Sequence, residues 1–201
     1  GNDIITSGTG VNTITTGAGV DTIYMGTGVD IIDAGAANDV IVAGASDLLA
    51  NDVVDGGDGT DQLQFEATGY TDESVFGGLT NIESIKGTAA NGISQALPFN
   101  ANTSFSIIDA SGAGDTDLTL SVGYTQDTTV KLGATDTTNA DNILNGTAVT
   151  GANVNLTVTA QNQGVFDTAT IITGGSATDT ITLTNVAGST ADPMVLTNAT
   201  S

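Results

Sequence analysis

A nine-residue period is the feature of this sequence that most constrains its fold. Acidic or amide residues recur at every ninth position from Asp3 to Asp39, and Asp52 and Asp61 are again nine apart. The full set is Asp3, Asn12, Asp21, Asp30, Asp39, Asp52 and Asp61. The spacing of thirteen between Asp39 and Asp52 indicates about four extra residues in one turn, around residues 46–50. Such regularity argues against disorder and predicts a stack of similar structural units.

Glycines and aliphatic residues keep the same phase as the acids. Glycine comes two or four residues before most of them, and an aliphatic residue comes two residues after each. The glycines are Gly1, Gly8, Gly10, Gly17, Gly19, Gly26, Gly28, Gly35, Gly57 and Gly59; the aliphatic residues are Ile5, Ile14, Ile23, Ile32, Ile41, Val54 and Leu63. Glycine permits tight turns, and an inward aliphatic residue between two outward neighbours is typical of a short strand. The period therefore predicts turns that alternate with three-residue strands, with two repeats to a coil of 18 residues.

The repeat resembles the G-G-x-G-x-D-x-U-x nonapeptide of RTX (haemolysin-type calcium-binding) proteins. Residues 56–64, Gly-Gly-Asp-Gly-Thr-Asp-Gln-Leu-Gln, match it at every fixed position. The other repeats depart from it at Ser7, Thr16, Met25, Ala34 and Ala43, at Ala37, and at Asn12. The resemblance covers residues 1–65 and implies an all-β fold, a right-handed parallel β-roll.

Because two repeats make one coil, the acidic positions alternate between two edges of the roll. Asp3, Asp21, Asp39 and Asp61 form one column, the Asp21 edge, and Asn12, Asp30 and Asp52 form the other, the Asp30 edge. Coils lie ~4.8 Å apart. Two carboxylates at that distance repel by roughly 1 kcal/mol in water and by ~3–4 kcal/mol at an effective dielectric constant of 20. Such a ladder needs cations between its rungs.

Calcium is the cation that this pattern favours, because it accepts carboxylates and backbone carbonyls together in flexible geometry. The resemblance implies ions between same-side loops of successive coils, held by the acidic residues and by carbonyls of the glycine-rich loops. The expected gaps are 3/21, 21/39, 39/61, 12/30 and 30/52, with the Asn12 site weakened by a lost charge. In the alternative interpretation, the acids are only turn residues of a metal-free solenoid. Asp33, Asp47, Asp55 and Asp58 fall out of phase and are expected at the solvated surface.

The period fades after Phe65, and residues 66–102 are expected to form a connecting segment. Residues 78–84, Gly-Leu-Thr-Asn-Ile-Glu-Ser, resemble a segment of RTX-type bacterial S-layer and large surface proteins, although an ordinary loop leading into a strand explains them equally well. Residues 103–201 are expected to form an irregular parallel β-solenoid, with a β-sandwich as the alternative. Expected strands there lie at residues 105–108, 118–122, 128–132, 154–159, 169–173, 180–186 and 194–197.

A second sequence like the RTX nonapeptide occupies residues 174–182, with Ala177 in place of one glycine. It makes Asp179 a further metal-ligand candidate. Asp115, Asp117 and Asp141 stand in similar acidic turns that precede an apolar residue and are secondary candidates.

Composition excludes several functions. With 23 acidic residues against 2 basic ones, and a formal net charge of −21, the chain is expected to bind no nucleic acid and to insert into no membrane. It contains no His or Cys, so it offers no Ser-His or Cys-His nucleophile pair and no His/Cys zinc site. Carboxylate pairs of the glycosidase kind remain conceivable, but there is no Trp and few aromatic residues to stack on a sugar. The chain is therefore expected not to be an enzyme.

Three functional classes remain, and the first is favoured. It is an extracellular structural segment, calcium-stabilised, of a bacterial S-layer or similar self-assembling surface array, whose partners are further copies of itself. The alternatives are a rigid module of a secreted RTX adhesin and the non-catalytic folding tail of an RTX enzyme. The resemblance implies type I secretion to the bacterial cell surface, where regions outside this sequence could meet polysaccharide. The chain starts in the middle of a repeat, at Gly1, and is expected to belong to a longer protein.

Overall fold

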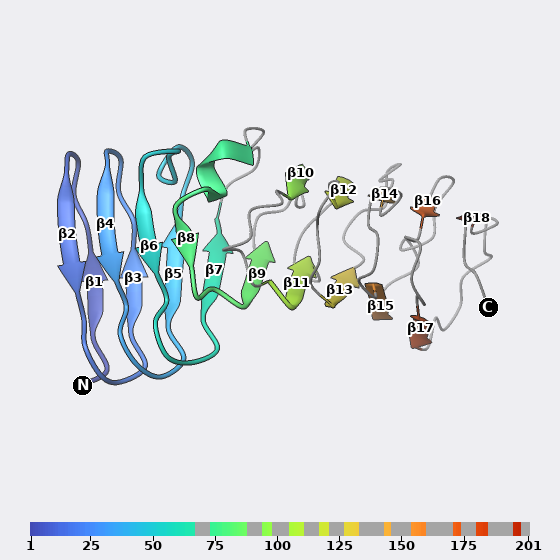
Figure 1. Cartoon of the computed structure of the whole chain (residues 1–201), viewed down its shortest axis with the longest axis horizontal. Coiled ribbons are helices and arrows are strands. Elements are labelled where there is room, and N and C mark those ends of the chain that lie inside the picture. The colour runs from blue at the N-terminus through green and yellow to red at the C-terminus, as the bar shows by residue number, and fades with distance from the viewer. Residues whose placement is uncertain are drawn as a thin grey trace.

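The computed structural model describes residues 1–66, 73–87, 94–97, 105–110, 117–120, 127–132, 143–145, 154–159, 171–173, 180–184 and 195–197. These residues form a parallel β-solenoid that runs along the chain from its N-terminal to its C-terminal end (Figure 1). None of the helical segments in the described part has the length and hydropathy of a membrane span.

The described strands form three parallel sheets, and each sheet takes alternate strands of the chain. The long sheet contains β1 (Ile4–Thr6), β3 (Thr22–Tyr24), β5 (Val40–Ala43), β7 (Gln62–Phe65), β9 (Ser84–Gly87), β11 (Ile107–Ala110), β13 (Thr128–Leu132), β15 (Val154–Thr159) and β17 (Thr180–Thr184). The four-stranded sheet contains β2 (Asn12–Thr15), β4 (Asp30–Asp33), β6 (Val53–Asp55) and β8 (Leu79–Thr80). The five-stranded sheet contains β10 (Ser94–Leu97), β12 (Asp117–Leu120), β14 (Ile143–Asn145), β16 (Ile171–Thr173) and β18 (Val195–Thr197).

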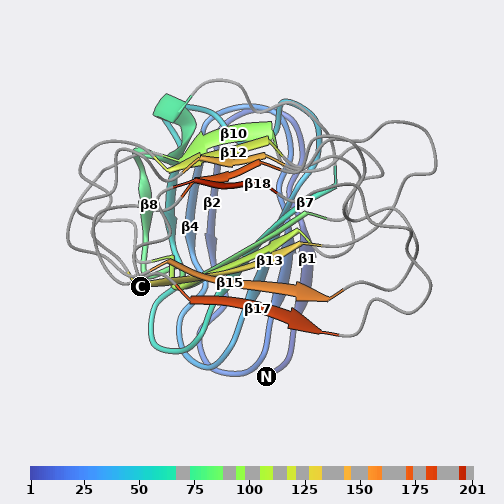
Figure 2. The ribbon, with the colours of Figure 1, turned by 90° about the vertical axis from the view of Figure 1, so that its right-hand side faces the viewer.

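Figure 2 looks along the solenoid from its C-terminal side and shows the five-stranded sheet lying opposite the later strands of the long sheet. The direction of the strands rotates between β1 and β17, as the intrinsic twist of β-strands requires. A short 3-10 helix, η1 (Glu73–Phe76), precedes β8, the last strand of the four-stranded sheet.

One column of aliphatic side chains runs through the interior behind the long sheet. The register pairs Ile5 with Ile23, Ile41, Leu63, Ile85, Ile108 and Val130 in turn. All of these beyond Ile5, which is half-buried, are fully buried. The same register continues to Leu156 and Ile181. The predicted inward aliphatic position is thus confirmed, and it persists well beyond the nonapeptides.

A second column lies behind the four-stranded sheet, where Ile14, Ile32, Val54 and Leu79 pair in turn. Where that sheet ends, three phenylalanines fill the interior. The ring of Phe76 lies edge-on to Phe65 and Phe105, at centroid distances of 6.1 and 6.3 Å. Aromatic packing therefore accompanies the change from thin, glycine-rich coils to the irregular ones.

The prediction of a parallel β-roll that continues into an irregular parallel β-solenoid is confirmed. Apart from β14, the described strands of residues 103–201 agree with the expected ones within two residues at each end. Their pairings are all parallel, which does not fit the β-sandwich alternative. Strands β10 and β14 were not among those expected. Residues 66–102, expected to form a connecting segment, supply β8 to the four-stranded sheet, β9 to the long one and β10 to the five-stranded one.

Candidate calcium-binding edges

The glycines lie where loops of successive coils touch. Gly35 and Gly57 have φ values of +94° and +89°, and a Cβ at either would collide with a carbonyl oxygen one coil earlier, that of Gly17 or Gly35 respectively. A Cβ added at Gly19, Gly26, Gly28 or Gly59 would likewise collide with a carbonyl oxygen one coil earlier. A Cβ added at Gly8, Gly10 or Gly17 would have no atom within 4 Å. Glycine is thus needed so that loops can stack and bring their carbonyl oxygens together in a column.

Carboxylates of the Asp21 edge are joined along the axis by hydrogen bonds. The backbone N–H of Asp3 donates to Oδ1 of Asp21, that of Asp21 to Oδ1 of Asp39, and that of Asp39 to Oδ1 of Asp61, each at 2.7 Å. Asp21, Asp39 and Asp61 are at most 1% exposed. One oxygen of each carboxylate therefore has a structural role in stacking the coils, which a neutral asparagine could also fill.

The second oxygen of each carboxylate has no such role. Within the described residues, Oδ2 of Asp21, Asp39 and Asp61 is buried and accepts no hydrogen bond. The described ion pairs are limited to Lys131 with Asp109, at 3.7 Å, so no lysine neutralises this edge. A buried carboxylate oxygen without a partner costs free energy unless a proton or a cation meets it.

The pKa values at this edge reflect the same conflict. Burial raises the pKa of Asp61 to about 6, and the neighbouring charges of Asp39, Glu83 and Asp55 act in the same direction. Burial also raises the pKa of Asp39. At Asp21 the hydrogen bond from the N–H of Asp3 prevails and lowers the pKa. Asp39 and Asp61 therefore resist ionisation in the absence of a cation, whereas Asp21 does not.

On the Asp30 edge, the carboxylate oxygens receive additional hydrogen bonds from amide groups. The side-chain amide of Asn12 donates to Oδ1 of Asp30 at 2.8 Å, and the N–H of Asp30 donates to Oδ1 of Asp52 at 2.8 Å. The extra residues before Asp52 supply a further donor, because the N–H of Leu49 bonds Oδ2 of Asp52 at 2.6 Å while Leu48 is buried. Burial still raises the pKa of Asp52. No carboxylate oxygen of this edge is among the unpartnered buried atoms of the described residues.

The donor set fits calcium. The described residues contain no group of three or more acidic side chains that could hold a metal by itself. An ion between coils would therefore be held by two carboxylates and by loop carbonyls, a combination that calcium accepts and magnesium disfavours. Because Oδ2 of Asp21, Asp39 and Asp61 has no hydrogen-bond partner, the donor set fits calcium best in the 21/39 and 39/61 gaps.

Acids outside the ladder phase have mixed roles. Asp33 and Asp58 are exposed, as expected. The expectation is wrong for Asp47 and Asp55, which are half-buried: Asp47 accepts the N–H of Gly44 at 2.8 Å, and Asp55 caps its own turn. Of the remaining candidates, Asp179, Asp115 and Asp141 lie outside the described residues, and Asp117 is the first residue of β12.

One ladder residue escaped the sequence reasoning. The backbone N–H of Asp61 donates to Oε2 of Glu83 at 2.8 Å, so Glu83 continues the hydrogen-bonded column of the Asp21 edge. A signal was present, since Glu83 follows Asp61 by 22 residues, the same spacing that separates Asp39 from Asp61. The signal was hidden because the residue is a glutamate outside any glycine-rich nonapeptide.

Taken together, the alternating parallel strands, the stacked glycine loops and the carboxylate ladder define a β-roll of the calcium-binding class. Comparison with known families agrees: residues 1–32, 24–47 and 49–65 match the RTX calcium-binding nonapeptide repeat. Residues 1–65, about a third of the chain, thus carry RTX calcium-binding repeats of a kind typical of secreted proteins. No curated protein and no solved structure matches it significantly.

Proposed function

We propose that the chain is a calcium-stabilised structural segment of an extracellular array on a bacterial cell surface, of the S-layer kind. The single observation that carries the proposal is the column of buried carboxylate oxygens without hydrogen-bond partners at Asp21, Asp39 and Asp61. A scaffold that folds only where calcium is plentiful explains why carboxylates stand where asparagines would satisfy the same backbone hydrogen bonds.

The physical basis is a switch between two charge states. Without cations, the net charge of −21 and the stacked carboxylates oppose close approach of the coils. Calcium, when bound, supplies positive charge between the rungs. The chain's own residues do the rest: glycine loops stack, backbone N–H groups hold one oxygen of each carboxylate, and the aliphatic columns close the interior. Export in a loose state followed by folding outside the cell is consistent with this sequence of events.

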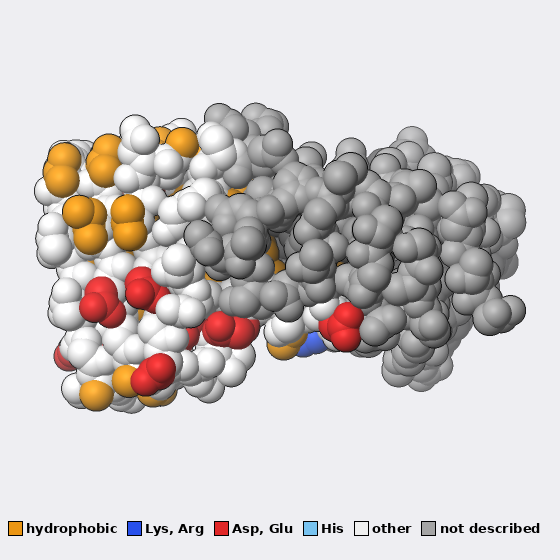
Figure 3. Space-filling view, viewed as in Figure 1, with side chains coloured by type: hydrophobic (Ala, Val, Ile, Leu, Met, Phe, Trp, Pro, Cys, Tyr) orange, Lys and Arg blue, Asp and Glu red, His pale blue; other side chains and the backbone are white. Residues whose placement is uncertain are grey.

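The surface of the roll supports a scaffolding role. Ile31 and Val53 are adjacent in the register of the four-stranded sheet and are both about half exposed, at 46% and 49%. Figure 3 shows such aliphatic side chains in rows on one face, with acidic side chains gathered separately. A row of this kind on a repetitive body suits lateral contact with further copies of the chain better than recognition of a small ligand.

Assembly of the whole chain in calcium tests the proposal. We expect the chelator-treated chain to remain dispersed, and the chain in millimolar calcium to form ordered sheets or filaments visible by negative-stain electron microscopy. Magnesium at the same concentration serves as the control and is expected to leave the chain dispersed. A compact monomer at every protein concentration in calcium would contradict the array and favour a spacer module of an adhesin.

A further inference from the structure

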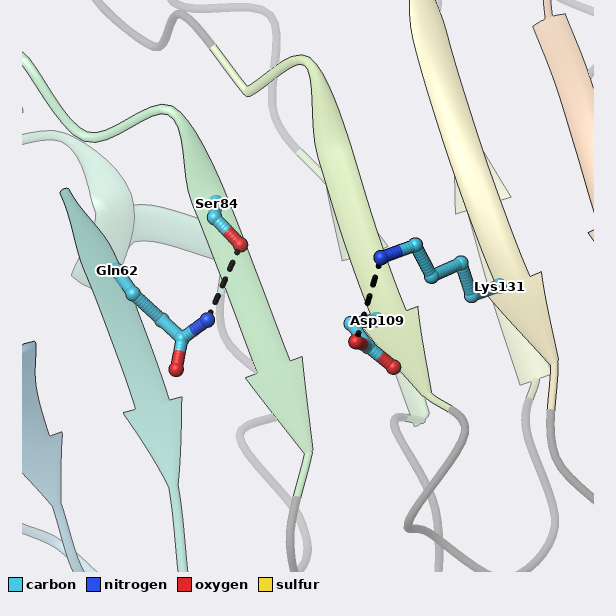
Figure 4. Close-up of polar contacts among 4 residues, drawn as sticks. All are labelled: Gln62, Ser84, Asp109 and Lys131. Atoms are coloured by element: carbon cyan, nitrogen blue, oxygen red, sulfur yellow. Dashed lines mark hydrogen bonds and ion pairs between the residues drawn. The ribbon is translucent and has the colours of Figure 1, made fainter. Parts of the chain in front are cut away.

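The register places Glu83 directly beside Asp61, one coil further along the solenoid. Strands β7 and β9 pair in parallel with Gln62 opposite Ser84. Figure 4 shows that these two side chains face each other, and the amide of Gln62 donates to the hydroxyl of Ser84 at 3.4 Å. The N–H groups of Glu83 and Ser84 both donate to the carbonyl oxygen of Asp61, at 3.1 and 2.9 Å. Asp61 and Glu83 are thus held together by the backbone at the start of the two strands.

Three oxygen groups belong to this junction, and two of them lie against Gly56. The carboxylate of Glu83 accepts the N–H of Asp61 through Oε2. Oδ2 of Asp61 is buried and without a hydrogen-bond partner, and it lies 2.9 Å from the position that a Cβ on Gly56 would occupy. The carbonyl oxygen of Asn81 approaches the same position even more closely. Both oxygens therefore lie against Gly56, and two hydrogen-bond acceptors cannot satisfy each other.

The loop that supplies Asn81 is held firmly in place. Asn81 has a φ of +51°, and its side-chain amide donates to Oδ1 of Asp55 at 2.7 Å. The N–H of Gly56 donates to the carbonyl of Thr80 at 3.0 Å. The carbonyl of Asn81 is therefore fixed against the coil that carries Asp61, with no freedom to turn toward solvent without breaking these bonds.

We infer that Asp61, Glu83 and the carbonyl oxygen of Asn81 form a further calcium site, beyond the last nonapeptide. The inference rests on the proposed calcium dependence of the ladder, and it deepens that function. No lysine in the described part of the chain forms an ion pair with either carboxylate, so the excess negative charge is left for a cation. Two carboxylates and a backbone carbonyl are a partial ligand set of the kind calcium accepts.

A site at this place has a structural consequence. It joins the last glycine-rich coil to β9, which is the strand that leads the long sheet into the irregular coils. Ile85, two residues after Glu83, is fully buried in the interior column. Calcium at the junction would therefore stabilise the first irregular coil as well as the nonapeptides.

The test is a calcium count on the whole chain and on Glu83→Gln, by native mass spectrometry and equilibrium dialysis. Glutamine keeps an oxygen that can accept the N–H of Asp61 but removes the charge. We expect Glu83→Gln to bind one calcium ion fewer, or to bind at one site at least about tenfold more weakly. The matched control is Glu66→Gln, the same change at an exposed residue outside the ladder, which is expected to bind like the original chain.

Three outcomes would overturn the inference. If the original chain binds no calcium, both this site and the proposed function are wrong. If the original chain binds calcium and a folded Glu83→Gln chain binds as many ions with the same affinities, only this site is wrong. Should Glu83→Gln fail to fold in calcium by circular dichroism, Glu83→Asp keeps the charge on a shorter side chain. It is expected to fold with one weakened site, and an unaltered set of affinities would again overturn the inference.

Discussion

Replacing Asp61 by asparagine should change the stability of the chain in opposite directions with and without calcium. Without calcium, ionised Asp61 is unfavourable, since its pKa is raised from 3.8 to about 6. A difference of this size is equivalent to at most about 3 kcal/mol, which solvent screening reduces to about 1–2 kcal/mol. Asparagine keeps the oxygen that accepts the N–H of Asp39, and its amide can donate to the nearby carbonyl of Asn81. Asp61→Asn should therefore stabilise the metal-free fold by about 1–2 kcal/mol.

In millimolar calcium the same substitution should be destabilising. It removes a ligand from two gaps, toward Asp39 and toward Glu83, and each site filled at a hundred times its Kd contributes about 2.7 kcal/mol. The net loss is then about 3–4 kcal/mol if both sites are lost.

Urea denaturation followed by circular dichroism measures the free energy of unfolding in both conditions. If the metal-free chain is unfolded without urea, titration with a stabilising osmolyte drives it to fold and gives the same free energy. Asp58→Asn is the control, because Asp58 is exposed and only three residues away. A substitution at Asp61 that destabilises the chain equally in chelator and in calcium would refute the reasoning.

Three further predictions concern protons and loops. The raised pKa of Asp61 means that the metal-free fold binds this proton more tightly than the unfolded chain does. The resulting stability should be present at acidic pH and be lost as pH rises through about 6. A denaturation midpoint in chelator that is no higher at pH 5 than at pH 7.5 would argue against it. Ala37 adopts a φ of +95°, so Ala37→Gly should raise the free energy of unfolding in calcium by about 0.5–2 kcal/mol, and an unchanged or lower value would count against strain at this turn. Gly35→Ala should lower the free energy of unfolding by about 2–4 kcal/mol through its clash with the carbonyl of Gly17, and wild-type stability would show that the loops are less tightly stacked.

The regular part of the fold was predictable because one local rule repeats. Each nonapeptide specifies its own turn and its own inward residue, so Ile23 and Ile41 could be placed inside without knowledge of any distant contact. The irregular coils obey the same register, with Ile108 and Val130 in the same column, but the segments between their strands vary in length and, apart from residues 174–182, repeat no glycine pattern. Strand β14, at Ile143–Asn145, is only three residues long and gives little alternation to detect.

The candidate site was predictable to the level of residues but not of atoms. Spacing alone put Asp21, Asp39 and Asp61 on one edge, and the structure brings them together. It could not show that one oxygen of each carboxylate bonds a neighbouring N–H while the other has no partner. Nor could it show that the inserted residues before Asp52 satisfy that carboxylate through Leu49, which makes the two edges unequal. These differences arise from backbone positions that the sequence pattern does not encode.

The central claim, that the carboxylate ladder is a metal site which controls folding, is tested most directly by sedimentation velocity on the chelator-stripped chain before and after addition of millimolar calcium. The account predicts that a slow, expanded particle becomes a compact particle or a large assembly, because cations neutralise the buried rungs. An unchanged sedimentation coefficient would contradict it, and the aspartates of the ladder would then be turn residues alone.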